Sequence, residues 1–578
     1  MATSTPINRD AIPGTVHLVD VEGNLQARHS SGQRDVILVP QPSNNPEDPL
    51  NWSPRRKQVT ISFSTPSPLF KPPTLPLLLY CDLAWLCLGY VLTCGISTAS
   101  IYSVLEPISK ETGLTLGTLN AGTGYMFLLL GWGCLFWQPV ALVYGKRPVY
   151  LLSLLANTAI MIWAPYTKME GQWLANKIIQ GFFEAPIESL CEISIADIYF
   201  THERGTYMGA YALMLFGSNF IAPIIAGFIN DGQGWEWVLY WSAIISSVGF
   251  VILFFFMEET NFYGRGSVQS GPGQAEKTGH MQSRTESDGA TTPSDSDVGK
   301  EKQAGIGTDV EAVQAGAMAS FSGKTWWQKL KLIDNQPGRP TNLFTMMYRP
   351  ILLLRFPVIA FSGFQYGLTL VMFNIMNATA SMILGNSPYD FKASMVGLSY
   401  FAPLIGAFIG ALYSGRFGDK LGLKLARCNG GIQEPEHKLW LFTLSLLLVP
   451  GALILWGVGA YHQVHWFGLL FGMGVLGVTN AISATTAINY TVDSYKDLSG
   501  EAVITIILVR NTMSFAIGYG ITPWVENTGL QNTFLAAAFI GMGCTAIFLP
   551  MIKLGKNFRV RSKETYWKYV ETSVLSAH

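Results

Sequence analysis

The sequence is poor in charged residues. Of its 578 residues only 13% are charged, about half the fraction usual in soluble proteins, whereas 49% are hydrophobic. This deficit indicates a lipid environment. Lys and Arg together number 38, as do Asp and Glu, so the net charge gives no reason to expect a nucleic-acid partner.

The motifs of several enzyme classes are also missing. The sequence has no Walker loop, no metal-ligand spacing and no nucleophile elbow, which argues against an ATP-driven pump and against an enzyme. We therefore expect no catalytic residue, no metal site and no cofactor. The seven cysteines form no CxxC pair and fit buried, small apolar positions. Residues 1–57 lack the apolar region of a secretory signal, so the first helix should serve as its own anchor.

Long apolar stretches are the dominant feature that is present. A helix needs about 20 apolar residues to cross the hydrocarbon core of a membrane. Twelve stretches meet this need: 77–104, 122–143, 148–166, 173–200, 206–229, 236–257, 351–380, 394–414, 439–460, 464–490, 502–523 and 532–552. The predicted fold is an all-α membrane protein of twelve transmembrane helices, arranged as two pseudo-symmetric six-helix bundles.

Polar segments divide the chain into five parts. We predict an N-terminal tail with a proline-rich approach (1–76), a first bundle (77–257), a linker (258–350), a second bundle (351–552) and a C-terminal tail (553–578). The linker stretch 264–320 is rich in Gly, Ser, Gln and Thr, and such a composition favours disorder. Residues 58–76 are read either as a proline-rich linker or as a segment foreign to the working protein.

Lys and Arg gather in alternate connections. They occur at 55–57, 146–147, 416–438 and 553–563, all on one side of the membrane if the chain crosses it twelve times. Because positive loops stay in the cytoplasm, both termini and the linker should be cytoplasmic. The plasma membrane is the expected location, with the vacuolar membrane as the alternative.

Two of these connections are related in sequence. Residues 415–424 read GRFGDKLGLK, and 138–147 read QPVALVYGKR at the same place in the first half. The first of these sequences resembles the loop signature of the major facilitator superfamily, which implies two bundles that rock about a central cavity. The resemblance implies a gating role for Gly145, Lys146, Arg147, Gly415, Arg416, Asp419 and Lys420. In the N-terminal copy Leu142 replaces the carboxylate of the signature, which puts that latch in doubt.

The predicted fourth helix carries a stripe of charge. Its members are spaced four, three, four and four residues apart: Lys177, Gly181, Glu184, Glu188 and Glu192. Three or four ionised groups facing lipid would cost about 10 kcal/mol, so the stripe must face protein or a water-filled cavity. We interpret these charged residues as a proton or cation site, with a structural ion-pair network as the alternative.

Other polar residues in the apolar stretches are candidates to line the cavity, although hydrogen bonds between helices explain each of them equally well. They are Asp82, Gln365, Asn374, Asn480 and Arg510. Lys177 with Gln180 and Gly181 resembles the Arg and Gln-Gly of proton-coupled antiporters in the same superfamily. The segments GTVHLVD (15–21) and GWEWVLYWSAI (234–244) resemble fungal multidrug:proton antiporters and histidinol/polyamine-type permeases.

These resemblances imply a secondary active transporter that moves a small organic solute by alternating access. The solute is expected to be a cationic metabolite or drug, and transport to be coupled to protons. The expected partners are therefore the solute, protons and the lipid bilayer, and the protein is expected to be monomeric. A membrane sensor that binds solute on the same fold without transporting it is the alternative function.

Overall fold

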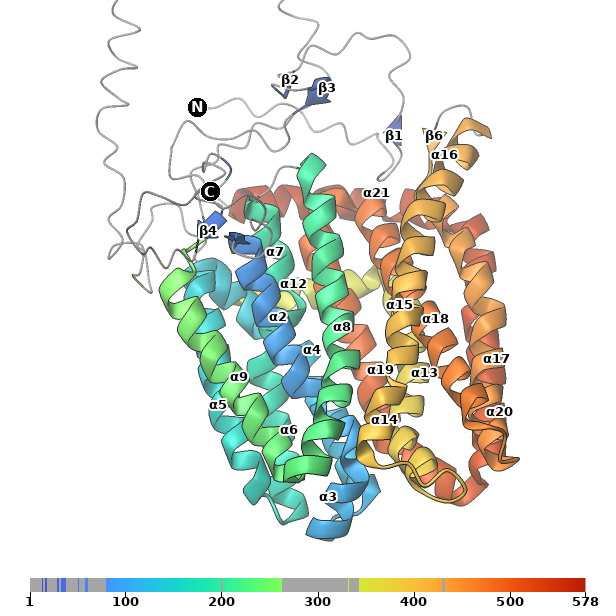
Figure 1. Ribbon diagram of the computed structural model, residues 1–578. Coiled ribbons are helices and arrows are strands. Elements are labelled where there is room, and N and C mark those ends of the chain that lie inside the picture. Colours follow the sequence, from blue (N-terminus) through green and yellow to red (C-terminus); the bar gives the residue numbers. More distant parts are fainter. Residues whose placement is uncertain are drawn as a thin grey trace, which may run out of the picture.

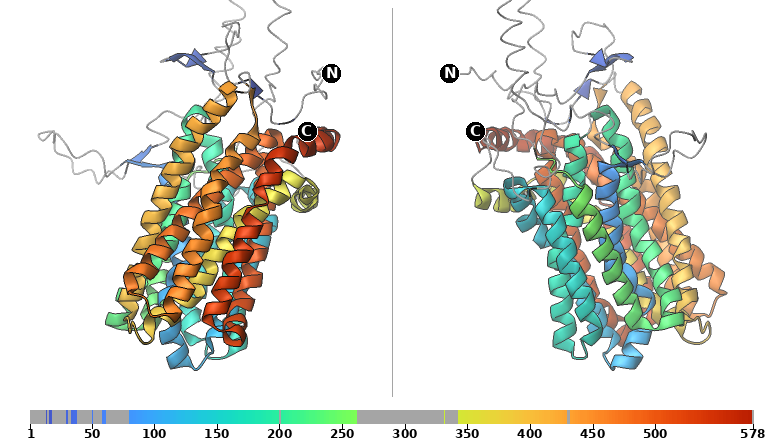
Figure 2. Two further views of the ribbon diagram at one scale, coloured as in Figure 1. Left: turned by 90° about the vertical axis from the view of Figure 1, so that its right-hand side faces the viewer. Right: turned by 60° about the vertical axis from the view of Figure 1, so that its left-hand side comes forward.

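The computed structural model describes residues 80–198, 201–261, 342–428 and 432–576, together with 13, 16–17, 29–30, 33–37, 50, 58–60 and 331. Within these residues the chain forms a bundle of long helices that lie roughly side by side (Figures 1 and 2). The predictions for 61–76 and for the disordered stretch 264–320 fall outside the described residues.

The first half of the bundle contains the helices that precede the linker. They are α2 (Leu83–Ala99), η2 (Ser100–Ser103), α3 (Leu105–Thr112), α4 (Leu116–Tyr144), α5 (Lys146–Trp163), η3 (Ala164–Tyr166), α6 (Glu170–Glu184), η4 (Ala185–Glu188), α7 (Leu190–Ile198), α8 (Thr201–Gln233) and α9 (Trp235–Phe256).

The second half contains the helices that follow the linker. They are α12 (Leu343–Leu352), η5 (Leu353–Arg355), α13 (Pro357–Gly385), α14 (Ala393–Ser399), α15 (Phe401–Leu412), η6 (Tyr413–Phe417), α16 (Gly418–Cys428), η7 (Pro435–Leu441), α17 (Phe442–Tyr461), α18 (Trp466–Ser494), η8 (Lys496–Leu498), α19 (Ser499–Thr528), α20 (Leu530–Thr545) and α21 (Phe548–Ser576). The segment η6 is a turn of π-helix, and the other η segments are 3-10 helices.

Short antiparallel strands accompany the bundle. Strand β1 (Val16–His17) pairs with β6 (Ile432–Gln433), and Val16 lies opposite Gln433. Strand β2 (His29–Ser30) pairs with β3 (Gln33–Ile37). Strand β4 (Gln58–Thr60) pairs with β5 (Tyr80–Asp82), where Gln58 lies opposite Asp82. The β1–β6 pair therefore joins the N-terminal segment to the connection that follows α16.

Eleven helices among the described residues are long and apolar enough to cross a membrane. The predicted span 173–200 is outside this set because it carries several charges; it folds as α6, η4 and α7. The predicted start of the first helix at 77 is wrong, since residues 80–82 form β5 and the helix begins at Leu83. Asp82 thus immediately precedes the helix, a position that aspartate favours over a helix interior.

Boundaries in the second half also differ from those predicted. Helix α12 begins at Leu343, inside the predicted linker, and the following long helix starts at Pro357 rather than at 351. Proline suits the first turn of a helix because its missing N–H would have no partner there. Helix α21 extends through the predicted C-terminal tail to Ser576.

The two halves meet mainly through α4 and α8 of the first half. Helix α4 packs against α19, and α8 packs against α14 and α15. At the α8–α14 contact the backbones nearly touch: a Cβ atom on Gly227 would lie 2.3 Å from the Ala393 carbonyl oxygen, and one on Gly397 would lie 2.4 Å from that of Pro223. Small residues allow such close approach of helices in membranes.

Apolar side chains cover both the interior and the exterior of the bundle. One buried cluster spans the halves, with Phe220 of α8 and Phe373 of α13 in edge-to-face contact at 5.4 Å between ring centroids. Large apolar residues on the outside, such as Leu155, Phe228 and Leu447, are more than half exposed. An exterior of this kind suits a protein surrounded by lipid.

Candidate functional site

The charged residues of the predicted fourth span lie inside the protein. Lys177 and Glu184 are completely buried, Glu188 is 7% exposed, and Glu192 is half-buried. An ionised side chain at the centre of a bilayer costs about 2.5–3.5 kcal/mol on insertion scales. Burial between helices replaces lipid around these charges with polar partners, as the sequence argument required.

The span is not one continuous helix. Pro186 lies in η4, directly after α6 ends at Glu184. Proline lacks the N–H of a helical hydrogen bond and clashes with the preceding turn, so the regular helix breaks here. The prediction of a single stripe is therefore wrong in this detail. The break separates Glu188 from Lys177 and Glu184.

Lys177 and Glu184 are joined through one amide. The Lys177 ammonium donates to Gln180 Oε1 at 2.8 Å, and Gln180 Nε2 donates to Glu184 Oε1 at 3.2 Å. On the other side, the Thr98 hydroxyl of α2 donates to Glu184 Oε2 at 2.8 Å. The Lys177 ammonium also lies 5.0 Å from the centre of the Trp173 ring, a cation–π contact. This network belongs entirely to the first half of the bundle.

Glu188 is bonded across the interface between the halves. Its carboxylate accepts a hydrogen bond from Arg510 of α19, and the two side chains are 8% and 5% exposed. Arg510 also donates to the Tyr366 hydroxyl of α13 at 2.8 Å, and its guanidinium lies 4.8 Å from the centre of that ring. A buried ion pair thus connects η4 of one half to two helices of the other.

Neighbouring contacts hold this pair in place. The Tyr211 hydroxyl of α8 donates to the Glu188 backbone carbonyl at 3.0 Å, which fixes the short turn η4. Arg510 Nε donates to Asn511 Oδ1 at 3.3 Å. Gly131 of α4 admits Asn511, because a Cβ atom at this position would lie 2.7 Å from Asn511 Cβ. Small residues therefore bring α4 and α19 close enough for the pair to be enclosed.

Further polar contacts cross between α4 and α19 away from the pair. Trp132 Nε1 donates to the Thr512 hydroxyl at 3.1 Å, and Asn120 Nδ2 donates to the Thr522 hydroxyl at 3.1 Å. These are single, neutral hydrogen bonds, which contribute about 1 kcal/mol each. The Glu188–Arg510 pair is therefore the strongest polar contact among these three.

The other predicted cavity residues are dispersed. Gln365 is buried and donates to the Thr545 backbone carbonyl at 2.9 Å, so it joins α13 to α20 within one half. Asn374 Nδ2 and Asn480 Oδ1 are buried and have no hydrogen-bond partner within the described part of the chain. Asp82 lies in β5, and its side chain is outside the described residues. Of the predicted cavity residues whose side chains the structure describes, Arg510 is the one bonded to the charged span.

The N-terminal gating connection is contacted by a carboxylate from another part of the chain, which the sequence did not indicate. Glu259, after α9, accepts the backbone N–H groups of Lys146 and Arg147 at 3.1 Å each. Gly145 adopts a φ of +121°, and a Cβ atom there would lie 2.6 Å from Glu259 Oε2. Glu259 therefore supplies, at the start of α5, the negative charge that Leu142 does not.

The ends of equivalent helices in the two halves are clamped in the same way. The buried ammonium of Lys146 pairs with Asp197 at the end of α7. In the second half Lys438 of η7 pairs with Asp493 of α18 at 2.5 Å. A lysine–aspartate ion pair therefore occurs in each half of the bundle.

The C-terminal gating connection forms the turn from α15 to α16. Gly415 and Arg416 lie in η6, and Lys420 lies in α16; Arg416 and Lys420 are exposed. Asp419 belongs to the first turn of α16, and its side chain is outside the described residues. The predicted partnership of Asp419 with Arg416 stays a prediction.

Tyr366 and Thr98 are site residues that the sequence analysis did not select. Each is a polar residue within an apolar helix. In the sequence they are therefore no more distinctive than Gln365 and Asn480, which were selected for the same reason. Helical spacing alone does not show which of these residues face the charged span, because the partners lie on other helices.

The chain is similar to proteins of one large family. The model of the Major Facilitator Superfamily matches residues 86–432. An uncharacterized MFS-type transporter of Schizosaccharomyces pombe is 26% identical, with 97% of this chain and 95% of that protein covered. Protein HOL1 of Saccharomyces cerevisiae is 25% identical, with 97% of each chain covered. The MFS antiporter QDR3 of Candida albicans is 21% identical over 80% of this chain and 76% of its own.

Solved structures show the same fold. A D-xylose–proton symporter superposes with a TM-score of 0.52 at 12% identity, covering 81% of this chain and 96% of its own. A POT family transporter in complex with a thioalcohol-conjugated peptide has a TM-score of 0.52 at 14% identity, covering 81% and 95%. At these identities the likeness concerns the arrangement of helices.

Proposed function

Because this chain belongs to the major facilitator superfamily and is a secondary transporter of small solutes, we propose that its solute is a small organic cation whose movement is coupled to protons. The relative QDR3 is named an antiporter, which is compatible with exchange of solute for protons. The buried Glu188–Arg510 pair carries the proposal, because it links the two halves through one carboxylate.

In the proposed mechanism Glu188 is the exchangeable member of the pair. An arginine keeps its charge at any pH a protein meets, whereas a carboxylate can take up a proton or bind another cation. Either event neutralises Glu188 and weakens its hold on Arg510. The halves are then free to rock, and a solute cation and a proton compete for the same carboxylate.

The Lys177–Gln180–Glu184 network is proposed as a second proton-accepting group. Glu184 lies in the same span as Glu188, and its carboxylate accepts hydrogen bonds from Gln180 and Thr98. The ammonium of Lys177, one amide away, adjusts the charge of the network. Glu192, the last of the predicted set, is proposed to extend this acidic path at the end of the span.

The gating connections are proposed to stabilise one state of the rocking motion. In the first half, Lys146 and Arg147 are tied to the end of α9 through Glu259. In the second, Asp419 with Arg416 is proposed as the latch. From the distribution of basic residues we further propose that both termini and the linker are cytoplasmic, and that the protein works as a monomer in the plasma membrane.

The test is transport in proteoliposomes with an imposed pH gradient. A panel of organic cations should identify a solute whose flux responds to the gradient. With that solute, Glu188→Gln should abolish gradient-driven flux while the protein still inserts and folds, because the amide cannot exchange a proton. Glu526→Gln, which changes an exposed carboxyl group on α19, is the matched control and should transport normally.

Two results would count against the proposal. Undiminished gradient-driven flux in Glu188→Gln would remove this carboxylate from the coupling step. A solute that binds tightly but shows no flux with or without a gradient would favour the alternative of a solute sensor.

A further inference from the structure

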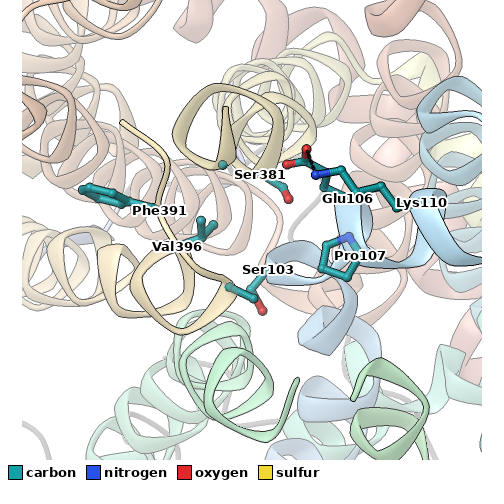
Figure 3. A pocket seen from close by; sticks show the side chains of 9 residues that line it. Ser103, Glu106, Pro107, Lys110, Ser381, Phe391 and Val396 are labelled. Carbon is teal, nitrogen blue, oxygen red and sulfur yellow. Dashed lines mark ion pairs between the residues drawn. The ribbon is translucent and has the colours of Figure 1, made fainter. Parts of the chain in front are cut away.

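Helix α12 (Leu343–Leu352) is a short helix at the edge of the bundle. Its 10 residues extend about 15 Å, which is about half the thickness of the hydrocarbon core of a membrane. Figures 1 and 2 show it in yellow, lying across the long helices at the end of the bundle where α21 lies. It is therefore at the opposite end from the pocket of Figure 3, in which the Glu106 carboxylate is paired with Lys110.

The outer face of α12 is apolar and exposed. Phe344 is 84% exposed, Tyr348 is 50% exposed and Ile351 is 38% exposed. These three residues are four and three positions apart, so their side chains form one stripe along the helix. We call this set the outer stripe. A contiguous group of large, exposed apolar side chains indicates a surface that contacts a membrane or a partner.

The inner face of α12 binds the second half of the bundle. Arg349 and Pro350 are buried there. The Arg349 guanidinium pairs with Glu501 of α19 at 3.4 Å and donates to the Tyr569 backbone carbonyl of α21 at 3.2 Å. The Thr505 hydroxyl of α19 donates to the Pro350 carbonyl at 2.7 Å. Because Arg349 is the one charged residue in the sequence of α12, its pairing with the protein leaves the outer stripe without charge.

Helix α12 also contacts the first half of the bundle, through α4. Helices α4 and α19 run antiparallel, since Asn120 bonds to Thr522 whereas Trp132 bonds to Thr512. Thr505, which precedes Thr512 on α19, therefore lies beside the last turns of α4. Because Thr505 binds the backbone of α12, this helix lies across the end of the seam between the two halves.

The chain enters an apolar span directly after α12. Helix α13, which is long and apolar enough to cross a membrane, begins at Pro357. The residues between the two helices, 353–356, can extend about 14 Å at most. Among them Leu354 is 41% exposed, so the exposed apolar surface continues from the outer stripe toward α13. The outer stripe therefore lies where the bundle enters the lipid.

We propose that α12 docks on the lipid bilayer, with its outer stripe inserted at the boundary between the headgroups and the acyl chains. A helix bound in this way lies in the plane of the surface, with its apolar face about 5–10 Å into that boundary. Phe344 and Ile351 contact acyl chains, and Tyr348 suits this depth because its hydroxyl reaches the headgroups. Docking rests on apolar contact and needs no anionic lipid. The bilayer surface thereby holds a helix that both halves of the bundle contact.

The experiment places a nitrobenzoxadiazole label on the outer stripe of the full-length protein in phosphatidylcholine vesicles. Phe344→Cys, made together with Cys428→Ser, carries the label, and Cys428→Ser alone gives the background from the other cysteines. Lipids brominated in the upper part of the acyl chain should quench this label strongly, whereas iodide in the water should quench it weakly. Cys428 of the unmodified protein, exposed at the end of α16, is the matched control, and the two quenchers should act on it in the reverse order.

Two pairs of substitutions test the stripe itself. Tyr348→Asp with Ile351→Asp adds charge to it and should shift the label at position 344 from lipid quenching to iodide quenching. Tyr348→Phe with Ile351→Leu keeps it apolar and should preserve the lipid quenching.

Three results would overturn the proposal. In the first, iodide quenches the label at position 344 as strongly as the label on Cys428. In the second, neither quencher reaches position 344, as expected beneath a second copy of this chain or another segment of it. In the third, lipid quenching appears only after anionic lipid is added. None of these measurements uses transport, so their outcome is independent of the proposed solute and of proton coupling.

Discussion

The Glu188–Arg510 pair predicts a strong thermodynamic coupling between the halves. Removal of one partner from a buried ion pair costs about 3–5 kcal/mol, because the other charge stays buried without compensation. Both side chains are less than a tenth exposed, so this range applies here. Glu188→Gln should fall at its lower end, since Arg510 keeps its hydrogen bonds to Tyr366 and Asn511. The double variant, with glutamine at both positions, should lie within about 2 kcal/mol of the unmodified protein.

The assay is equilibrium unfolding in mixed micelles of the unmodified protein, the two single variants and the double variant. The coupling energy, obtained as the difference between the double change and the sum of the single changes, should exceed about 2 kcal/mol. Single effects that add to within about 0.5 kcal/mol would refute the reasoning, because residues that do not interact behave in this way.

Three further predictions concern packing and capping. Glu259→Ala should lower the free energy of unfolding by about 1–2 kcal/mol, measured by thermal unfolding, because the first N–H groups of α5 lose their acceptor. Gly181→Leu should reduce the yield of folded, monodisperse protein in size-exclusion chromatography, since even its Cβ would lie 2.2 Å from a backbone carbonyl oxygen of α4; Gly171→Leu on the same helix meets nothing within 4 Å and should be tolerated. Arg559→Ala should destabilise by about 3–5 kcal/mol in the same unfolding assay, because Arg559 is fully buried and binds both carboxylate oxygens of Glu436 at 2.9 and 2.7 Å.

Much of the fold was predictable because hydrocarbon imposes a length and a composition on each membrane helix. The exact first and last residues of each helix depend on the local sequence, and these were less predictable. The first helix begins at Leu83, after β5, and not at 77 as hydropathy indicated, and α13 begins at Pro357, later than expected. Pro186 is present in the fourth span, but the sequence did not show whether the helix would continue past this proline or break there. The break separates Glu188 from Lys177 and Glu184.

The charged site was predictable only in part. The price of exposing Glu184 and Glu188 to lipid was enough to predict that they point inward. Their partners were not predictable in this way, because Glu188 and Arg510 are 322 residues apart in the sequence. Glu259 shows the same limit. Its carboxylate contacts the turn in which Leu142 replaces the expected carboxylate, but Glu259 follows α9 and is far from that turn in the sequence. The spacing of residues along the turn therefore could not indicate it.

The near-contact of backbones between α8 and α14 has a practical consequence. A Cβ atom on Gly227 or on Gly397 would lie less than 2.5 Å from a backbone carbonyl oxygen of the facing helix. One added methyl group at either position would therefore clash with that helix. An alanine at either position would prise the two helices apart at that end and leave the opposite end untouched. The close packing of the two halves at this end of the bundle therefore depends on the absence of side chains at Gly227 and Gly397.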